Sequence, residues 1–287
     1  MLVAQRSRHR IRPFRLHRPT TAEEAVGLHA ASSGSAAYMG GGIDLMAALK
    51  TGAGPDNVIH LGLLPGWKSI VEREKEIVLG AGTTHQQLAD AASIRSILPA
   101  LCDAWSRVAN NRIRVKGTVA GNLMARNQSY DFPMAAVASG AELEFLDRHF
   151  AARRIGADRS AELPHGALLT SITLPRVRPL AYAVQLQWKP IVAFALSFRR
   201  EQDTVVGRLV VGCGYGSIAF SIIRLERCLF DSPARETPLD IAERLCSSLP
   251  SPLSDWRASS EYRRHILKVL VRREIEKIRA EGPGDED

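Results

Sequence analysis

The stretch SAAYMGGGIDLMAALKTG, residues 35–52, constrains the fold more than any other part of the chain. It places three consecutive glycines between a short apolar run and a short apolar helix. A tight turn is one explanation, because glycine adopts positive φ without steric cost. An anion site is the other, because bare backbone amides at a helix start let a phosphate approach closely. The stretch alone is compatible with both explanations.

A second stretch of the same kind is KGTVAGN, residues 116–122, which also runs into a helical pattern. It combines small residues with groups that can donate hydrogen bonds to an anion, namely Gly117, Ala120, Gly121, Thr118 and Asn122. One such loop is usually only a turn, whereas two loops of this kind fit a ligand with two phosphates.

Asp131 follows in the stretch SYDFP and also has two explanations. It can cap a helix, because Asp before a proline near the first helical position is common. It can instead orient a hydroxyl or an amine of the ligand that the two loops hold.

The rest of the chain indicates an α+β protein rather than a doubly wound sheet, because strands and helices do not alternate regularly. A helix starts after Pro19, with Thr20 or Thr21 as its cap and acids in its first turn. Helical residues extend from Thr84 through Asn110, and two helices end the chain, at 238–248 and 261–280. The second should bury Tyr262, Ile266, Leu267, Val269 and Leu270. Predicted strands are VIHL, WKSIVE, EIVLGAG, YAVQLQ, IVAFALSF and VVGRLVVG.

Composition excludes several classes of protein. At 287 residues the chain is long enough for about two domains of roughly 150 residues. The net charge of +8 arises largely from six arginines in the first eighteen residues, without interleaved aromatic platforms, so a nucleic-acid groove is not expected. No apolar run spans a membrane and no apolar segment follows the arginines, so we expect a cytoplasmic protein without a membrane partner. The four cysteines form no CxxC pair, and neither a metal site nor a catalytic motif is expected.

Five separated segments resemble, in order, the FAD-binding medium subunit of the molybdenum hydroxylases, a family that includes carbon monoxide dehydrogenase and xanthine dehydrogenase. YMGGGIDL resembles its glycine-rich motif AGGTDL, and RIRVKGTVAGNL resembles its motif IRNxATIGGNL. The other three are FRLHRPTTAEEAVGL, SYDFPMAAVASGAELEF and SDWRASSEYRRHILKVLVRREIEK. The resemblance extends from about Phe14 to Ile278.

The resemblance implies a two-part FAD-binding domain of the vanillyl-alcohol oxidase (PCMH) type, followed by a smaller α+β domain of the carbon monoxide dehydrogenase flavoprotein type. We place these domains at 13–177 and 178–280, between a basic arm (1–12) and an acidic tail (281–287). FAD would be held by the first glycine loop, the second loop, Asp131 and two positions of weaker alignment: Tyr38, Met39, Gly40, Gly41, Gly42, Ile43, Asp44, Leu45, Thr118, Ala120, Gly121, Asn122, Asp131, Leu169 and Gln185.

Two residues depart from the family motifs. Ile43 replaces a Thr or Ser whose hydroxyl can bond a phosphate, and Ala120 replaces the first glycine of a pair and could crowd the ligand. His85 is interpreted as a solvent-facing residue at a helix start rather than a covalent flavin link, and Trp105 as a packing or subunit-contact residue.

The resemblance also implies a function. The chain would pass electrons from an iron–sulfur (2Fe–2S) small subunit through FAD to a terminal acceptor, after a molybdenum-cofactor large subunit has oxidised the substrate. The alternatives are a flavin-poor structural subunit of such a complex, which Ile43 and Ala120 favour, and a free-standing flavin oxidase of the same fold.

Overall fold

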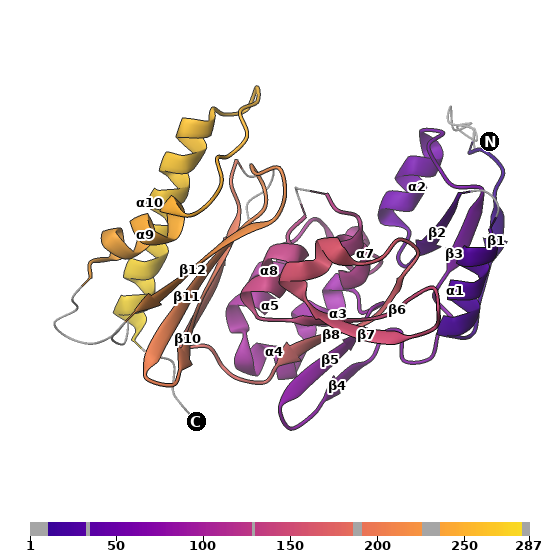
Figure 1. Cartoon of the computed structure of the whole chain (residues 1–287), viewed down its shortest axis with the longest axis horizontal. Helices are drawn as coiled ribbons and strands as arrows, with labels where there is room; N and C mark the ends of the chain where they lie inside the picture. The colour runs from indigo at the N-terminus through magenta and orange to yellow at the C-terminus, as the bar shows by residue number, and fades with distance from the viewer. Residues whose placement is uncertain (1–10, 33–34, 128–129, 186–190, 226–235, 283–287) are drawn as a thin grey trace, which may run out of the picture.

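The computed structural model describes residues 11–32, 35–127, 130–185, 191–225 and 236–282 (Figure 1). Its first part is a three-stranded parallel sheet with strand order β1-β3-β2, connected by two helices. Helix α1 begins as predicted, because the Thr21 side chain accepts a hydrogen bond from the Glu24 amide at 3.1 Å. The elements are β1 (Arg15–His17), α1 (Ala22–Ala31), β2 (Ala36–Met39), α2 (Ile43–Lys50) and β3 (Asn57–His60).

The second part is a five-stranded antiparallel sheet with strand order β4-β5-β8-β6-β7. Its alternating apolar residues face a core that α1 and the following helices share. The strands are β4 (Ile70–Glu72), β5 (Glu76–Gly80), β6 (Glu142–Leu146), β7 (Ala152–Gly156) and β8 (Leu168–Pro175), and the 3-10 helix η1 (Ala157–Glu162) follows β7.

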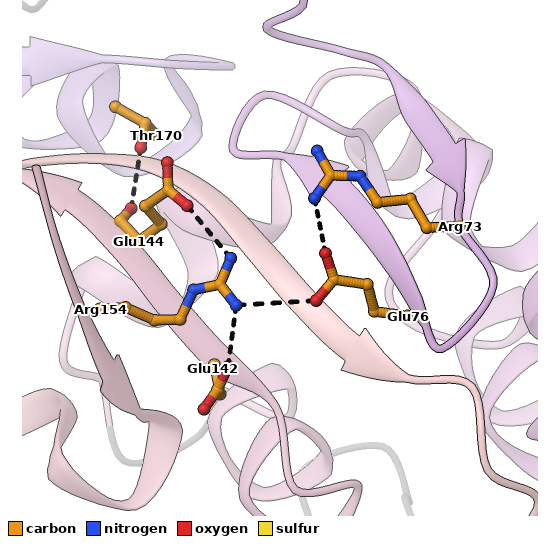
Figure 2. A network of polar contacts seen from close by, with 6 residues as sticks. All are labelled: Arg73, Glu76, Glu142, Glu144, Arg154 and Thr170. Carbon is orange, nitrogen blue, oxygen red and sulfur yellow. Dashed lines mark hydrogen bonds and ion pairs between the residues drawn. The ribbon is translucent and has the colours of Figure 1, made fainter.

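Arg154 on the edge strand β7 forms ion pairs with acidic residues of β6 and β5 on the surface of this sheet (Figure 2). Arg154 Nη1 lies 3.2 Å from Glu142 Oε2 and 3.6 Å from Glu76 Oε2, and Nη2 lies 3.4 Å from Glu144 Oε2. Arg73 adds a second cation at 2.6 Å from Glu76 Oε1. The Arg154 side chain is 41% exposed, so each pair contributes no more than about 1 kcal/mol to stability.

The helical residues predicted over 84–110 form three separate helices, α3, α4 and α5. Ala91 has extended backbone dihedrals between α3 and α4, and Pro99, which has no amide to donate, begins α5. The helices of this region are α3 (His85–Asp90), α4 (Ala92–Ile97), α5 (Pro99–Ser106), α6 (Asn111–Arg114), α7 (Val119–Met124) and α8 (Phe132–Ala138).

The C-terminal part is a four-stranded antiparallel sheet, order β12-β11-β10-β9, covered by two helices. One face, with Ala195 and Val210, joins the core of the first two parts, and the other, with Leu196 and Leu209, packs under the helices. The elements are β9 (Ala181–Gln185), β10 (Phe194–Glu201), β11 (Thr204–Val211), β12 (Ala219–Leu225), α9 (Pro238–Ser247) and α10 (Ser260–Glu281). Sequence reasoning missed β12. The α+β fold class is confirmed.

The buried face of α10 differs from the predicted one. Tyr262 is 49% exposed, and Ile266, Val269 and Leu270 are only half-buried. Leu267 is buried as predicted, and the other buried residues are Arg263, Val271, Glu274, Ile275 and Ile278. Two of them are charged, which apolar periodicity alone could not reveal.

Three polar side chains of the C-terminal sheet bind the carboxyl end of α8. Tyr182 donates its hydroxyl to the carbonyl oxygen of Ala135 at 3.1 Å. Arg199 donates to the carbonyl oxygen of Ser139 at 2.6 Å, and Arg208 to that of Val137 at 3.0 Å. Two cations at the negative end of a helix fit the helix dipole. The opposite end of α8 begins at Asp131, so these contacts connect the C-terminal sheet to the candidate site. Within the described residues, no helix is long and apolar enough to cross a bilayer.

Candidate functional site

A cavity of about 1570 Å³ lies where the three parts of the chain meet. Drug-sized ligands usually occupy about 300–1,000 Å³, so this cavity has room for a dinucleotide. The first wall is the stretch from Tyr38 to Leu45, and the second runs through α5, α7 and Asp131. The C-terminal part closes it with residues of β9 and α10 together with Arg257.

The three glycines of the first loop let it pack directly on the second loop. A Cβ on Gly41 would lie 1.7 Å from the carbonyl oxygen of Lys116, and one on Gly40 would lie 2.9 Å from Thr118 Oγ1. Gly42 has a φ of 74°, a conformation that side chains disfavour. The close approach of two backbones therefore explains the glycines at 40 and 41, and a turn explains the third.

The start of α2 offers a row of open amides to the cavity. Gly42 is the N-cap and has no side-chain cap, and the first helical bond runs from the Met46 amide to the Gly42 carbonyl oxygen. Among the described residues, the amides of 42–45 have no hydrogen-bond acceptor. Four such donors at the positive end of a helix can bind an anion. Ile43 lacks the hydroxyl of the family motif, but its amide is one of these four donors.

The second loop offers side chains rather than amides. The amides of Val119, Ala120 and Gly121 donate within the protein, to Thr83 O at 2.9 Å, Ala81 O at 3.3 Å and Thr118 Oγ1 at 3.0 Å. Thr118 therefore keeps its O–H as a donor. Asn122 Oδ1 accepts from the Phe132 amide at 3.1 Å, which leaves its amino group as a donor.

Two of the predicted site residues lie in the core instead of the cavity wall. Ala120 is 5% exposed and Leu169, on β8, is 4% exposed, and both pack in the main hydrophobic core. Neither is among the residues that line the cavity. The methyl group of Ala120 thus packs away from the ligand space, which removes the reason for expecting it to crowd a phosphate.

Asp131 lines the cavity and does not cap α8 with its side chain. Burial raises the pKa of its carboxyl group to about 6. Asp131 is half-buried, and a partly desolvated carboxylate on a cavity wall favours the ligand-binding explanation over the cap. Tyr130 beside it donates its hydroxyl to Asp44 on the opposite wall. That contact was not expected from the sequence.

Gln185 lies on the C-terminal wall, on β9. Its Nε2 donates to Glu274 Oε2 at 2.8 Å, and Lys277 Nζ lies 3.8 Å from Glu274 Oε1. Sequence reasoning missed the last two residues because they belong to a helix far along the chain. Tyr38 borders the cavity, but its hydroxyl donates to the carbonyl oxygen of Gly166 at 2.9 Å, and its ring stacks on a histidine.

The interpretation of His85 as solvent-facing is wrong. The residue is 3% exposed, and its Nδ1 accepts a hydrogen bond from Trp105 Nε1 at 3.0 Å. Burial lowers the pKa of its imidazole to about 4, so the ring is neutral at pH 7. His85 also lines the cavity. The predicted packing role of Trp105 is consistent with its complete burial, but no local pattern in the sequence indicates its contact with His85.

Comparison with known proteins fits this geometry. Residues 12–177 match the family model described as the FAD binding domain in molybdopterin dehydrogenase, and residues 190–278 match the CO dehydrogenase flavoprotein C-terminal domain. The chain belongs to the molybdopterin dehydrogenase FAD-binding family. The resemblance predicted from the sequence motifs is confirmed, and so is FAD as the cofactor.

Relatives in this family match this chain over more than nine-tenths of its length. The carbon monoxide dehydrogenase medium chain of Afipia carboxidovorans is 29% identical, over 93% of this chain and 97% of the relative. The xanthine dehydrogenase FAD-binding subunit of Escherichia coli O157:H7 is 24% identical over 93% and 97%. A chain in the crystal structure of cyanide-inactivated Cu,Mo-CO dehydrogenase is 26% identical, with a TM-score of 0.80 over 94% of this chain and 98% of that one.

The residues of the cavity fit FAD. The open amides at the start of α2 suit a diphosphate, and the donors of Thr118 and Asn122 lie on the wall beside them. The half-buried carboxylate of Asp131 can accept a hydrogen bond from a sugar hydroxyl. Leu45 and the β9 wall provide apolar surface for a ring system. In the part of the chain that the structure describes, no three His, Cys, Asp or Glu side chains gather as a metal site would require.

Proposed function

We propose that this chain is the FAD-bearing electron-transfer subunit of a molybdenum hydroxylase complex. In such a complex a molybdenum-cofactor large subunit oxidises the substrate and a 2Fe–2S small subunit relays the electrons. FAD held by this chain would supply the redox chemistry that connects these electrons to a terminal acceptor. The row of open amides at the start of α2, in a cavity large enough for a dinucleotide, is the observation that carries the proposal.

The chain itself binds and orients the cofactor. We infer that the amides of 42–45 hold the diphosphate together with Thr118 and Asn122, and that Asp131 accepts a hydrogen bond from a hydroxyl of the cofactor. Leu45 and Gln185 would lie against the flavin, and the C-terminal wall would exclude water from it. The boundary at 177/178 falls in the connection between β8 and β9, so both domains would contribute to one site.

The visible spectrum of the purified full-length chain tests the cofactor assignment. We expect flavin bands, and about one FAD per chain released by acid or heat. A colourless protein that also fails to bind added FAD would contradict the proposal and favour the flavin-poor structural subunit.

Co-purification tests the partners. A tagged chain, expressed with the other subunits of its complex, should carry along one molybdenum-containing and one iron–sulfur protein in constant ratio. A flavin-loaded chain that purifies alone and turns over a substrate with oxygen would favour the free-standing oxidase instead.

A further inference from the structure

The polar side chains around the glycine loops share one property, which is that their acceptor atoms are already used inside the protein. Thr118 Oγ1 accepts from the Gly121 amide at 3.0 Å, and Asn122 Oδ1 accepts from the Phe132 amide at 3.1 Å. Each therefore keeps a donor for a ligand, the O–H of Thr118 and the amino group of Asn122. These two donors suit an anionic group of a ligand.

His85 likewise uses one ring nitrogen as an acceptor within the protein and has the other available as a donor. The indole nitrogen of Trp105 is a donor only, so the bond of 3.0 Å makes His85 Nδ1 an acceptor. A neutral imidazole carries one proton, which must then lie on Nε2. Within the described residues, Nε2 has no hydrogen-bond partner, although His85 is 3% exposed and lines the cavity. Nε2 itself is not fully buried, so its N–H is open to the cavity and available to a ligand.

The neighbouring glycine keeps this donor uncovered. The His85 amide donates to the Gly117 carbonyl oxygen at 3.0 Å, which fixes the histidine against the second loop. A Cβ on Gly117 would lie 2.9 Å from His85 Cδ2 and 3.2 Å from Nε2. Gly117 also lines the cavity and precedes Thr118, so the imidazole donor belongs to the wall that the second loop presents.

We propose that His85 is a cofactor-binding residue whose Nε2–H donates a hydrogen bond to an oxygen of the FAD diphosphate, with Trp105 as the positioning residue that fixes its tautomer. This inference rests on the proposed function of the cavity. A neutral donor adds a hydrogen bond without adding a positive charge close to the flavin, whose reduction potential such a charge would shift.

Two substitutions separate this role from a structural one. His85→Asn keeps an acceptor near the Nδ1 position for Trp105 but has no donor at the Nε2 position. His85→Gln places an amide nitrogen near the Nε2 position but offers no acceptor at Nδ1. FAD affinity is measured by titration of the FAD-free full-length chain, and the thermal midpoint of the same sample reports its folding.

We expect His85→Asn to weaken FAD binding by about tenfold to a hundredfold, the value of one hydrogen bond to a charged group, with a nearly unchanged midpoint. His85→Gln should lower the midpoint and yet bind FAD more tightly than His85→Asn. Equal affinity of His85→Asn and wild type, or affinities that simply follow the midpoints, would overturn the inference. A wild-type chain that binds no FAD would overturn the proposed function as well.

A measurement on the wild-type chain keeps the test independent of folding. Nitrogen-15 NMR of labelled histidine should show His85 protonated at Nε2 and not at Nδ1, and FAD should shift the Nε2–H resonance. A proton on Nδ1, or an Nε2–H resonance that FAD leaves unmoved, would overturn the inference.

Discussion

Gly41 is the residue whose backbone is most closely packed at the site. Replacing Gly41 by Ala puts a methyl group on the Lys116 carbonyl, which is backbone and cannot move aside cheaply. We expect Gly41→Ala to lower the free energy of unfolding by about 1–3 kcal/mol and to reduce bound flavin per chain. Gly27→Ala is the control, because that site in α1 has open space, and it should stabilise by about 0.5–1 kcal/mol. Urea unfolding of both variants measures the change in the free energy of unfolding. Equal changes in the two variants would contradict the close packing of the two glycine loops.

Asp131 gives a prediction with a pH dependence. Its carboxyl pKa is about 6 in the folded chain and 3.8 ordinarily, so the folded FAD-free chain holds this proton more tightly than the unfolded chain does. The charged carboxylate therefore destabilises the folded state fully above pH 6, and this penalty disappears as the pH falls from 6 to about 4. Asp131→Asn should raise the thermal midpoint of the FAD-free chain at pH 8 by a few degrees, at about 2–4 °C per kcal/mol, but much less at pH 4.5.

The same substitution should act oppositely on the cofactor. Asp131→Asn would leave an uncharged amide oxygen where the carboxylate accepted a hydroxyl, and FAD should bind about fivefold to tenfold more weakly at pH 8. The control is Asp103→Asn, on the same cavity wall, whose carboxylate is exposed and paired with Arg95. If Asp131→Asn lowers the midpoint at pH 8, or if FAD binding is unchanged, Asp131 has a structural role.

At the scale of elements, the C-terminal sheet depends on its contacts with α8. Arg199 is largely buried and donates to the Ser139 carbonyl oxygen, so removing it leaves that acceptor without this cation. We expect Arg199→Ala to lower the free energy of unfolding by about 2 kcal/mol. Arg224→Ala on β12 is the control, because its side chain is 68% exposed and its pair with Glu201 should contribute less than about 0.5 kcal/mol. If chemical denaturation shows equal losses in the free energy of unfolding for both variants, the contact of Arg199 with α8 does not contribute to stability.

Elements with strong local signals could be predicted from the sequence. The cap at Thr21 and the apolar runs of β10 and β11 are local features, and both were found. The helical residues over 84–110 were predicted without the breaks between them, because helix propensity continues across Ala91 while the backbone there is extended. Strand β12 was missed because its exposed Phe220 and Ile222 break the expected apolar alternation.

Some features of the candidate site could also be predicted from the sequence, and others could not. The two glycine loops and Asp131 could be found because their residue types are unusual in sequence. The sequence could not show which amides lack a hydrogen-bond acceptor, since this depends on the carbonyl oxygens of Thr83 and Ala81 accepting from amides of the second loop. His85 was misinterpreted because its partner lies twenty positions away on another helix. Such pairings follow from tertiary packing, which a single sequence does not encode locally.

At the scale of the whole molecule, segments from both ends of the chain form the walls of the cavity. A ligand that fills the cavity should therefore stabilise both walls together. The α2 amides form one wall, and Gln185 with Glu274 forms another. At a hundredfold excess over its Kd, FAD should stabilise the folded chain by about 2.7 kcal/mol. Hydrogen exchange should slow in residues 42–45 and also in β9 and α10, although these segments are remote in sequence.

ADP is the matched control for this coupling, because it carries the diphosphate without the flavin. It should protect the amides of 42–45 and leave β9 and α10 exchanging as in the free chain, with a smaller rise in the thermal midpoint. If FAD and ADP protect the same residues, the C-terminal wall does not contact the flavin, and Gln185 has only the structural role of holding Glu274. Protection by FAD of both walls together is the outcome that the shared cavity requires, since only a ligand touching each wall stabilises both against local opening.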